Sequence, residues 1–166
     1  MNYETQTNKQ ENEMTYTELK NQKLEEYKDN FDSYLQWKRE NREMLMDMER
    51  EEKIAKIKEV KAFANRTGYS DVNPCEVIKV ISDKCVEIRD MDTKQLEWKR
   101  DWSVGGFAGH LNNQRDQKWE ITSNENNPVY RIRFSNPKKG YTTWKDKHGR
   151  TYSMHDEAIK FYDYNF

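Results

Sequence analysis

The stretch EVIKVISDKCVEIRD, residues 76–90, has the composition of a β-hairpin. Valine and isoleucine recur in both halves, charged residues lie between them, and the polar run Ser82-Asp83-Lys84 separates the halves. Two β-branched runs around a short polar turn predict an antiparallel pair of strands. The hairpin therefore indicates a small β-rich domain, which we assign to residues 69–166.

The rest of this domain continues as short strand-like segments. Further strands are expected at residues 95–102, 118–122, 129–134, 141–145 and 151–153. Gly149 supplies the positive backbone angle of the turn before the last strand, and one helical turn is expected after Ser153. Short strands paired in sequence order favour a strongly bent antiparallel sheet or an SH3-like barrel. The residues expected in its core are Trp98, Trp102, Trp119, Trp144, Ile78, Ile88, Ile121, Ile132 and Phe134.

Residues 14–67, which precede this domain, contain neither glycine nor proline and are dominated by strong helix formers. Thr15 and Glu18 form the pattern of a capping box, which starts a helix, and Gly68 is the kind of residue that ends one. We therefore predict that residues 14–68 form a helical arm. With the β-rich domain, this arm makes the chain an α+β protein.

Apolar side chains recur at spacings of three and four along the arm and form a stripe on one helical face. A single helix of this span would be about 75 Å long at ~1.5 Å per residue, which is longer than a small domain is wide. Such a stripe is covered by a hairpin that folds back on itself, by a homodimer, or by a different protein. The residues expected to contact a partner are Tyr27, Phe31, Trp37, Met44 and Met48.

The overall composition argues against several classes of protein. Charged residues make up 36% of the chain, hydrophobic ones make up 34%, and the formal net charge is −1. A chain that wraps duplex nucleic acid normally has a large basic excess, which this sequence lacks. Residues 1–13 are polar without periodicity and predict a disordered tail. No signal-peptide pattern and no apolar run of ~20 residues occur, so we expect a cytoplasmic protein without membrane contact.

No motif in the sequence predicts an enzyme. Gly105, Gly106 and Gly109 lack the strand, loop and helix context of a dinucleotide site, and no phosphate-binding lysine and serine pair follows them. The histidines and cysteines have none of the short spacings of a zinc site. Cys75 and Cys85 are expected to be reduced packing residues. We therefore expect no catalytic residue, no cofactor and no metal.

The segment from Tyr130 to Arg150 is locally basic. Arg131 and Arg133 are two residues apart on a predicted strand, so they share one face of the sheet. Such a face binds single-stranded nucleic acid or a phosphorylated ligand when exposed Tyr141 or Trp144 adds base stacking, or it is simply the solvated face of a sheet. The candidate binding residues are Arg131, Arg133, Lys138, Lys139, Lys145, Lys147 and Arg150, with Asp146 as the single acidic residue among them.

Residues 105–119 combine three glycines with a run of amide side chains. One interpretation is a structural loop that crosses the end of the barrel, with amides that pair with backbone groups. The other is a site that orients a small polar or nucleotide-like ligand over Trp119. The residues of that site would be His110, Asn112, Asn113 and Gln114.

Residues 71–166 resemble uncharacterised small proteins of tailed bacteriophages. The resemblance rests on the segment that begins Cys75-Glu-Val-Ile-Lys-Val, on Gly105 to His110 with the following Asn113-Gln114 and Trp119, on the Asp146 to Gly149 turn, and on the ending Lys160 to Phe166. It implies no site residue.

Together, the resemblance and the arm predict a non-enzymatic interaction protein. It would act in the bacterial cytoplasm by binding, and so blocking or redirecting, a host protein or protein complex, with antiviral defence components among the candidates. The alternative is a nucleic-acid or nucleotide-binding module that uses the basic residues between 131 and 150.

Overall fold

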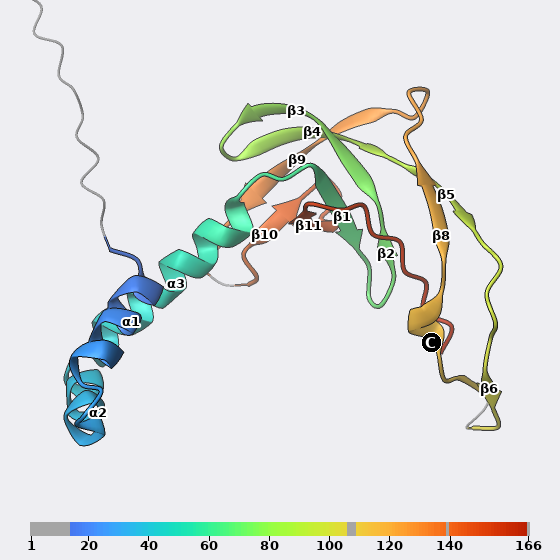
Figure 1. The fold of residues 1–166 in the computed structure, drawn as a ribbon. Coiled ribbons are helices and arrows are strands. Elements are labelled where there is room, and N and C mark those ends of the chain that lie inside the picture. The colour runs from blue at the N-terminus through green and yellow to red at the C-terminus, as the bar shows by residue number, and fades with distance from the viewer. Residues whose placement is uncertain (1–13, 106–108, 139, 166) are drawn as a thin grey trace, which may run out of the picture. The chain divides into compact units, whose positions relative to one another are not determined.

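The computed structural model describes residues 14–105, 109–138 and 140–165 (Figure 1). It is an α+β structure, in which three helices are followed by a six-stranded antiparallel barrel consistent with the SH3-like class. The predicted fold class is therefore confirmed. The chain divides into two compact units, Met1–Lys53 and Ile54–Phe166. The predicted tail, residues 1–13, lies outside the described residues.

The first unit is built from α1 (Tyr16–Glu26), α2 (Phe31–Glu40) and most of α3 (Arg42–Lys58). The capping box forms as predicted, because the Glu18 N–H donates to Thr15 Oγ1 at 3.2 Å and the Thr15 N–H donates to Glu18 Oε2 at 2.8 Å. The hydroxyl of Thr17 donates to Glu52 Oε1 at 2.7 Å and joins α1 to α3. The helical segment is therefore folded back on itself rather than continuous.

The end of the helical segment differs from the prediction. The last helix ends at Lys58, whereas the sequence predicts helix up to Gly68. The intervening residues form β1 (Phe63–Thr67), which pairs with β11 (Thr151–His155) along its whole length. Ala64 and Asn65 are fully buried there. Tertiary pairing with a strand far along the chain therefore overrides the local helix propensity.

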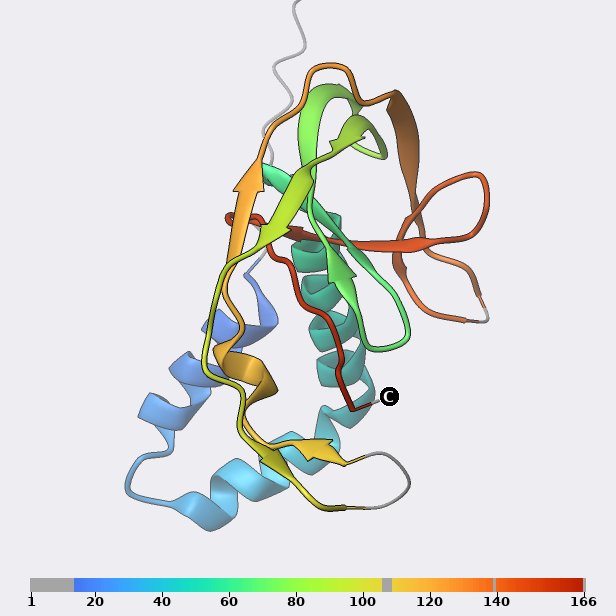
Figure 2. The same ribbon diagram turned by 90° about the vertical axis from the view of Figure 1, so that its right-hand side faces the viewer.

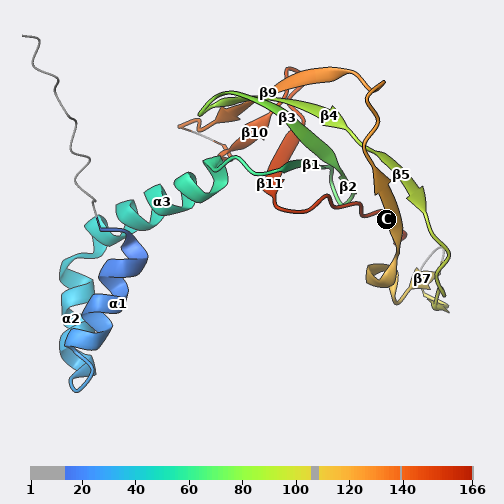
Figure 3. The same ribbon diagram turned by 45° about the horizontal axis from the view of Figure 1, so that its top comes forward.

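The barrel closes through six strands in the order β11, β10, β9, β4, β3 and β1, with β1 paired back to β11 (Figure 3). The remaining bounds are β3 (Cys75–Ser82), β4 (Cys85–Asp90), β9 (Val129–Ser135) and β10 (Thr143–Lys145). The short β2 (Val72–Asn73) pairs with β1. The predicted hairpin is confirmed, since β3 and β4 pair from Cys75 opposite Asp90 to Ser82 opposite Cys85.

The barrel encloses a small core. Ile88, Ile132 and Trp144 are fully buried as predicted, and the Trp144 indole N–H donates to the Ile57 carbonyl at 2.9 Å. Two of the predicted core residues are instead at the surface, because Ile78 is 42% exposed and Trp102 is 52% exposed. The full set of buried residues in the core cluster is Ala64, Cys75, Val86, Ile88, Ile132, Trp144 and Tyr152.

Between β4 and β9 the chain makes a separate two-stranded ribbon (Figure 2). Its elements are β5 (Asp92–Gln95) with β8 (Trp119–Thr122), β6 (Trp102–Ser103) with β7 (His110–Leu111), and the 3-10 turn η1 (Gln114–Asp116). The prediction of a strand at residues 95–102 is wrong, because β5 ends at Gln95, the residue at which the predicted strand begins. The helical turn predicted after Ser153 is also wrong, since β11 continues to His155 and the following residues run along the ribbon.

Candidate anion-binding site

A hollow of about 620 Å³ lies beside the outer face of β9 and β10. It is lined by Pro128, Tyr130, Arg131, Arg133, Ser135, Lys145, Asp146, Lys147, His148 and Arg150. Five of the predicted basic residues therefore converge on one place. Of the other two, Lys138 is exposed outside the lining and Lys139 lies outside the described residues.

The strand pattern explains why these cations share one side of the sheet. Ile132 lies between Arg131 and Arg133 on β9 and is fully buried, so its two neighbours point out of the barrel. Lys145 follows the buried Trp144 on β10 and is directly opposite Arg133 in the strand register. Burial of alternate residues therefore fixes the position of the basic ones.

The five basic side chains differ in whether they pair with a carboxylate. The guanidinium of Arg131 donates to Glu87 Oε1 at 2.9 and 3.0 Å, and Arg150 is paired with Asp146. In the part of the chain that the structure describes, Arg133, Lys145 and Lys147 form no ion pair. These three cations are therefore the ones that an incoming anion meets without displacing a carboxylate.

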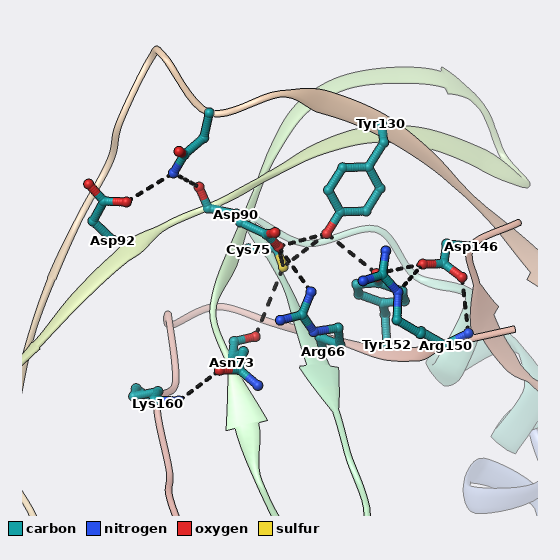
Figure 4. A network of polar contacts seen from close by, with 11 residues as sticks. Arg66, Asn73, Cys75, Asp90, Asp92, Tyr130, Asp146, Arg150, Tyr152 and Lys160 are labelled. Atoms are coloured by element: carbon teal, nitrogen blue, oxygen red, sulfur yellow. Dashed lines mark hydrogen bonds and ion pairs between the residues drawn. The ribbon is translucent and has the colours of Figure 1, made fainter. Parts of the chain in front are cut away.

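The turn between β10 and β11 is held by Asp146, whose side chain is only 2% exposed (Figure 4). Its carboxylate accepts from the backbone N–H of His148 at 2.8 Å and of Arg150 at 3.0 Å, and from the Tyr152 hydroxyl at 3.1 Å. Gly149 has a φ of 81°, as the sequence predicts. The carboxylate therefore fixes the turn that carries three of the lining residues.

The ionisation of Asp146 follows from the same contacts. Burial by itself would raise the pKa of this carboxyl, but hydrogen bonds from Arg150, from the His148 N–H and from the Tyr152 hydroxyl lower the pKa below its ordinary value. Asp146 is thus charged at neutral pH, and its donors all come from its own turn and the adjoining strand β11. It acts as a structural anchor of the site and forms no ion pair with Arg133, Lys145 or Lys147.

A chain of hydroxyl groups continues from this turn into the barrel (Figure 4). The Tyr152 hydroxyl oxygen lies 3.4 Å from that of Tyr130, and Tyr130 donates to Asp90 Oδ1 at 2.7 Å. The Cys75 thiol donates to the same oxygen at 3.1 Å. Burial raises the pKa of both tyrosines and raises the pKa of Cys75 to about 12. These groups therefore stay protonated and brace the site rather than react.

The two aromatic residues predicted to stack on bases differ in their exposure. Trp144 belongs to the core with no exposed surface, so it is not the stacking residue that the basic face requires. Tyr141, in the segment between β9 and β10, is 89% exposed. Pro128 and Tyr130 also line the hollow, although neither carries a charge that singles it out in the sequence.

The described part of the amide-rich segment, residues 109–119, belongs to the ribbon and does not cross the end of the barrel. Asn113 accepts from the Asp101 N–H and donates to the Lys99 carbonyl, both at 2.9 Å, and Gln114 Oε1 accepts from the Tyr164 N–H at 3.0 Å. Asn112 accepts from the Ser103 hydroxyl at 2.9 Å, while His110 is exposed. These contacts favour the structural interpretation of the amides.

The predicted contact residues of the helical segment divide into two groups. Phe31 is 63% exposed and Met44 is 45% exposed. The first unit, which we call the helical unit, half-buries the other three residues, Tyr27, Trp37 and Met48. The Trp37 ring stacks on Tyr34 with centroids 6.0 Å apart. The unit therefore covers part of its own aromatic stripe and leaves the rest at its surface.

No family model, curated protein or solved structure matches the chain. The resemblance to phage proteins stays a prediction. Among the described residues, no group of three or more histidines, cysteines or carboxylates is placed to hold a metal ion. None of the helices in the described ranges has the length and apolar character to cross a membrane.

Proposed function

We propose that the barrel is a non-enzymatic module that binds single-stranded nucleic acid in its basic hollow. The observation that carries this proposal is the convergence of Arg131, Arg133, Lys145, Lys147 and Arg150 on one space of about 620 Å³. Three of these cations form no ion pair within the described residues. Such a local excess suits a ligand with several phosphates in a row.

A phosphate backbone matches this arrangement better than a single carboxylate ligand. Binding a polyanion releases its condensed counterions, which is a favourable contribution that grows with the number of phosphates neutralised. The guanidinium of Arg133 also has the planar fork that donates two parallel hydrogen bonds to one phosphate. Lys145, its cross-strand neighbour, contacts the next phosphate as a point charge.

A single strand fits the site better than a duplex. The chain has a formal net charge of −1, so it lacks the large overall basic excess that is typical of a duplex-binding protein. Tyr141, 89% exposed, provides a ring on which an unpaired base can stack. Stacking of this kind contributes about 1–3 kcal/mol per base and requires no particular sequence.

Salt dependence of oligonucleotide binding tests the proposal. We expect a fluorescein-labelled oligothymidine to bind with log K falling linearly against log salt, with a slope of about −2 to −3 for three to four neutralised phosphates. The slope is measured by fluorescence anisotropy across a salt series. A peptide nucleic acid of the same sequence, which has an uncharged backbone, is the control and should not bind. Absent binding, or binding that salt does not weaken, contradicts the proposal.

The surface of the helical unit favours a second function, the binding of a partner protein. Phe31 and Met46 are 63% and 58% exposed, so the helical unit presents large apolar side chains to solvent. A bacterial host protein is the partner that we propose, and a second copy of the chain is the alternative. Phe31→Ala should weaken capture of such a partner about tenfold, as ~1.4 kcal/mol of lost burial implies. Unchanged capture, measured beside the Lys28→Ala control, would contradict this function.

A further inference from the structure

A second hollow, of about 350 Å³, lies within the helical unit where its helices meet. We call it the helical groove. It is lined by Tyr16, Leu35, Lys38, Arg39, Arg42, Leu45, Met46 and Glu49. Its floor is aliphatic, with Leu45 6% exposed and Leu35 half-buried. Met46, 58% exposed, stands at its margin, so a good part of this apolar surface faces outward.

The charged lining of the groove is predominantly basic. Lys38, Arg39 and Arg42 form no ion pair with any described residue. Glu49, the one acid of the lining, pairs with Lys53 at 2.7 Å. Arg42 is the first residue of α3, where the positive end of the helix dipole disfavours a cation. Its position therefore does not serve the stability of its own helix.

We propose that the helical groove docks an amphipathic helix of a partner protein, whose apolar face is flanked by aspartate and glutamate. This inference rests on the second proposed function, the binding of a protein by the helical unit. Apolar side chains at positions i, i+3 and i+4 of the partner would cover Leu35 and Met46, as in helix-in-groove recognition. Carboxylates beside them would meet the three unpaired cations of the groove.

The aliphatic floor distinguishes this groove from the basic hollow of the barrel. Nucleic acid gains its affinity from phosphate contacts and from stacking on aromatic rings, but Tyr16 is the single aromatic residue in the lining of this groove, and Leu35, Leu45 and Met46 form its apolar surface. A helix, by contrast, gains from burying aliphatic surface. The leucine floor together with the unpaired cations Lys38, Arg39 and Arg42 therefore favours an acidic amphipathic helix as the partner.

The adjacent surface extends the groove. Phe31 lies one turn before Leu35 and two turns before Lys38 on α2, so the three side chains share a helical face. Phe31 is 63% exposed, which adds an aromatic anchor beyond the hollow. A partner helix that spans this face needs roughly three turns, or ~11 residues.

Selection from a display library of helical peptides tests the inference. The library has random residues at its surface positions and no bias in charge, and the target is the full-length protein. We expect enrichment of peptides with apolar residues at i, i+3, i+4 and i+7 and with acidic residues beside them. Enrichment of neutral or basic peptides, or no enrichment at all, overturns the inference.

Charge variants place the enriched peptides on the groove. We expect Arg42→Glu to weaken the binding of a selected peptide about tenfold, because a carboxylate of the peptide then meets a like charge. Arg50→Glu on the same helix, outside the lining, makes the same change in net charge and should leave binding within about twofold. Equal losses in both variants overturn the inference. Circular dichroism before each measurement confirms that the helices are intact.

Further comparisons separate this inference from the proposed functions. The peptide should bind equally to a protein with Arg133→Glu and Lys145→Glu, because those residues belong to the barrel. Loss of peptide binding there overturns the groove as the site. If Phe31→Ala abolishes capture of a host protein while Arg42→Glu and Met46→Glu leave it intact, the protein-binding function stands and the groove is not its site. A dimer that Met46→Glu dissociates would show that a second copy occupies the groove, and would also overturn the inference.

Discussion

Replacing both Arg133 and Lys145 with glutamate is expected to lower the affinity for single-stranded DNA about 100-fold, or ~2.7 kcal/mol, at low salt. The two residues lie opposite each other on β9 and β10, and neither forms an ion pair within the described residues. Each replacement removes an attraction for phosphate and adds a repulsion. Fluorescence anisotropy with a labelled oligothymidine measures the change.

These two positions are better probes than their basic neighbours. Arg131 shares its guanidinium with Glu87, and Arg150 shares its own with Asp146, so their replacement would disturb an existing ion pair of the barrel. Arg133 and Lys145 point away from the core, and their replacement should leave the thermal unfolding temperature unchanged. A large fall in that temperature would show that the variant tests the fold instead of the site.

A matched variant separates a site from a general effect of charge. Lys94→Glu with Lys118→Glu makes the same change in net charge on the ribbon, where both lysines are exposed and outside the hollow. We expect this variant to lose less than about threefold in affinity at physiological salt, because a Debye length of ~8 Å screens remote charges. Equal losses in the two variants would contradict a localised binding site.

The parts of the fold that sequence predicts correctly are those decided by neighbouring residues. The hairpin of β3 and β4 depends on β-branched runs around Asp83 and Lys84, which form its turn in the structure. The capping box at Thr15 is equally local. Such features depend on side chains within a few residues of one another, so the sequence pattern contains most of the relevant physics.

The incorrect predictions concern segments whose conformation depends on distant contacts. Residues 63–67 have no strong local preference for a strand, and they form β1 because β11, β2 and β3 pair with them. A strand is predicted at residues 95–102, but Trp98 in this segment packs against Tyr164 instead. Periodicity along the chain does not reveal such partners.

The candidate site shows the same division. The spacing of Arg131 and Arg133 predicts that they share a face, and the structure agrees. Which cations remain unpaired depends on Glu87, a cross-strand neighbour on β4, and no local spacing reveals that contact. In the sequence, Asp146 is notable only as the single acidic residue among basic ones. In the structure, its buried carboxylate accepts the hydrogen bonds that order the turn.

Asp146→Asn is expected to lower the free energy of unfolding of the barrel by about 2 kcal/mol at pH 7, the scale of a lost hydrogen bond to a charged group. Asparagine retains an oxygen for the N–H groups of His148 and Arg150, but it no longer pairs as an anion with the Arg150 guanidinium. Urea unfolding followed by tryptophan fluorescence measures the difference. Asp83→Asn, which removes an ion pair to Lys58 at an exposed carboxylate, is the control and should leave the midpoint unchanged.

The pH dependence identifies the charge as the cause. Because the folded pKa of Asp146 lies below its unfolded value of about 3.9, the carboxylate stabilises the fold above that value and stops doing so as pH falls through the folded pKa. Asparagine does not titrate. The difference between the natural protein and Asp146→Asn should therefore be full at pH 7 and shrink as pH falls below about 4. A difference of the same size at pH 7 and pH 3 would attribute the anchoring of the turn to the shape of the side chain, and would contradict the role of its charge.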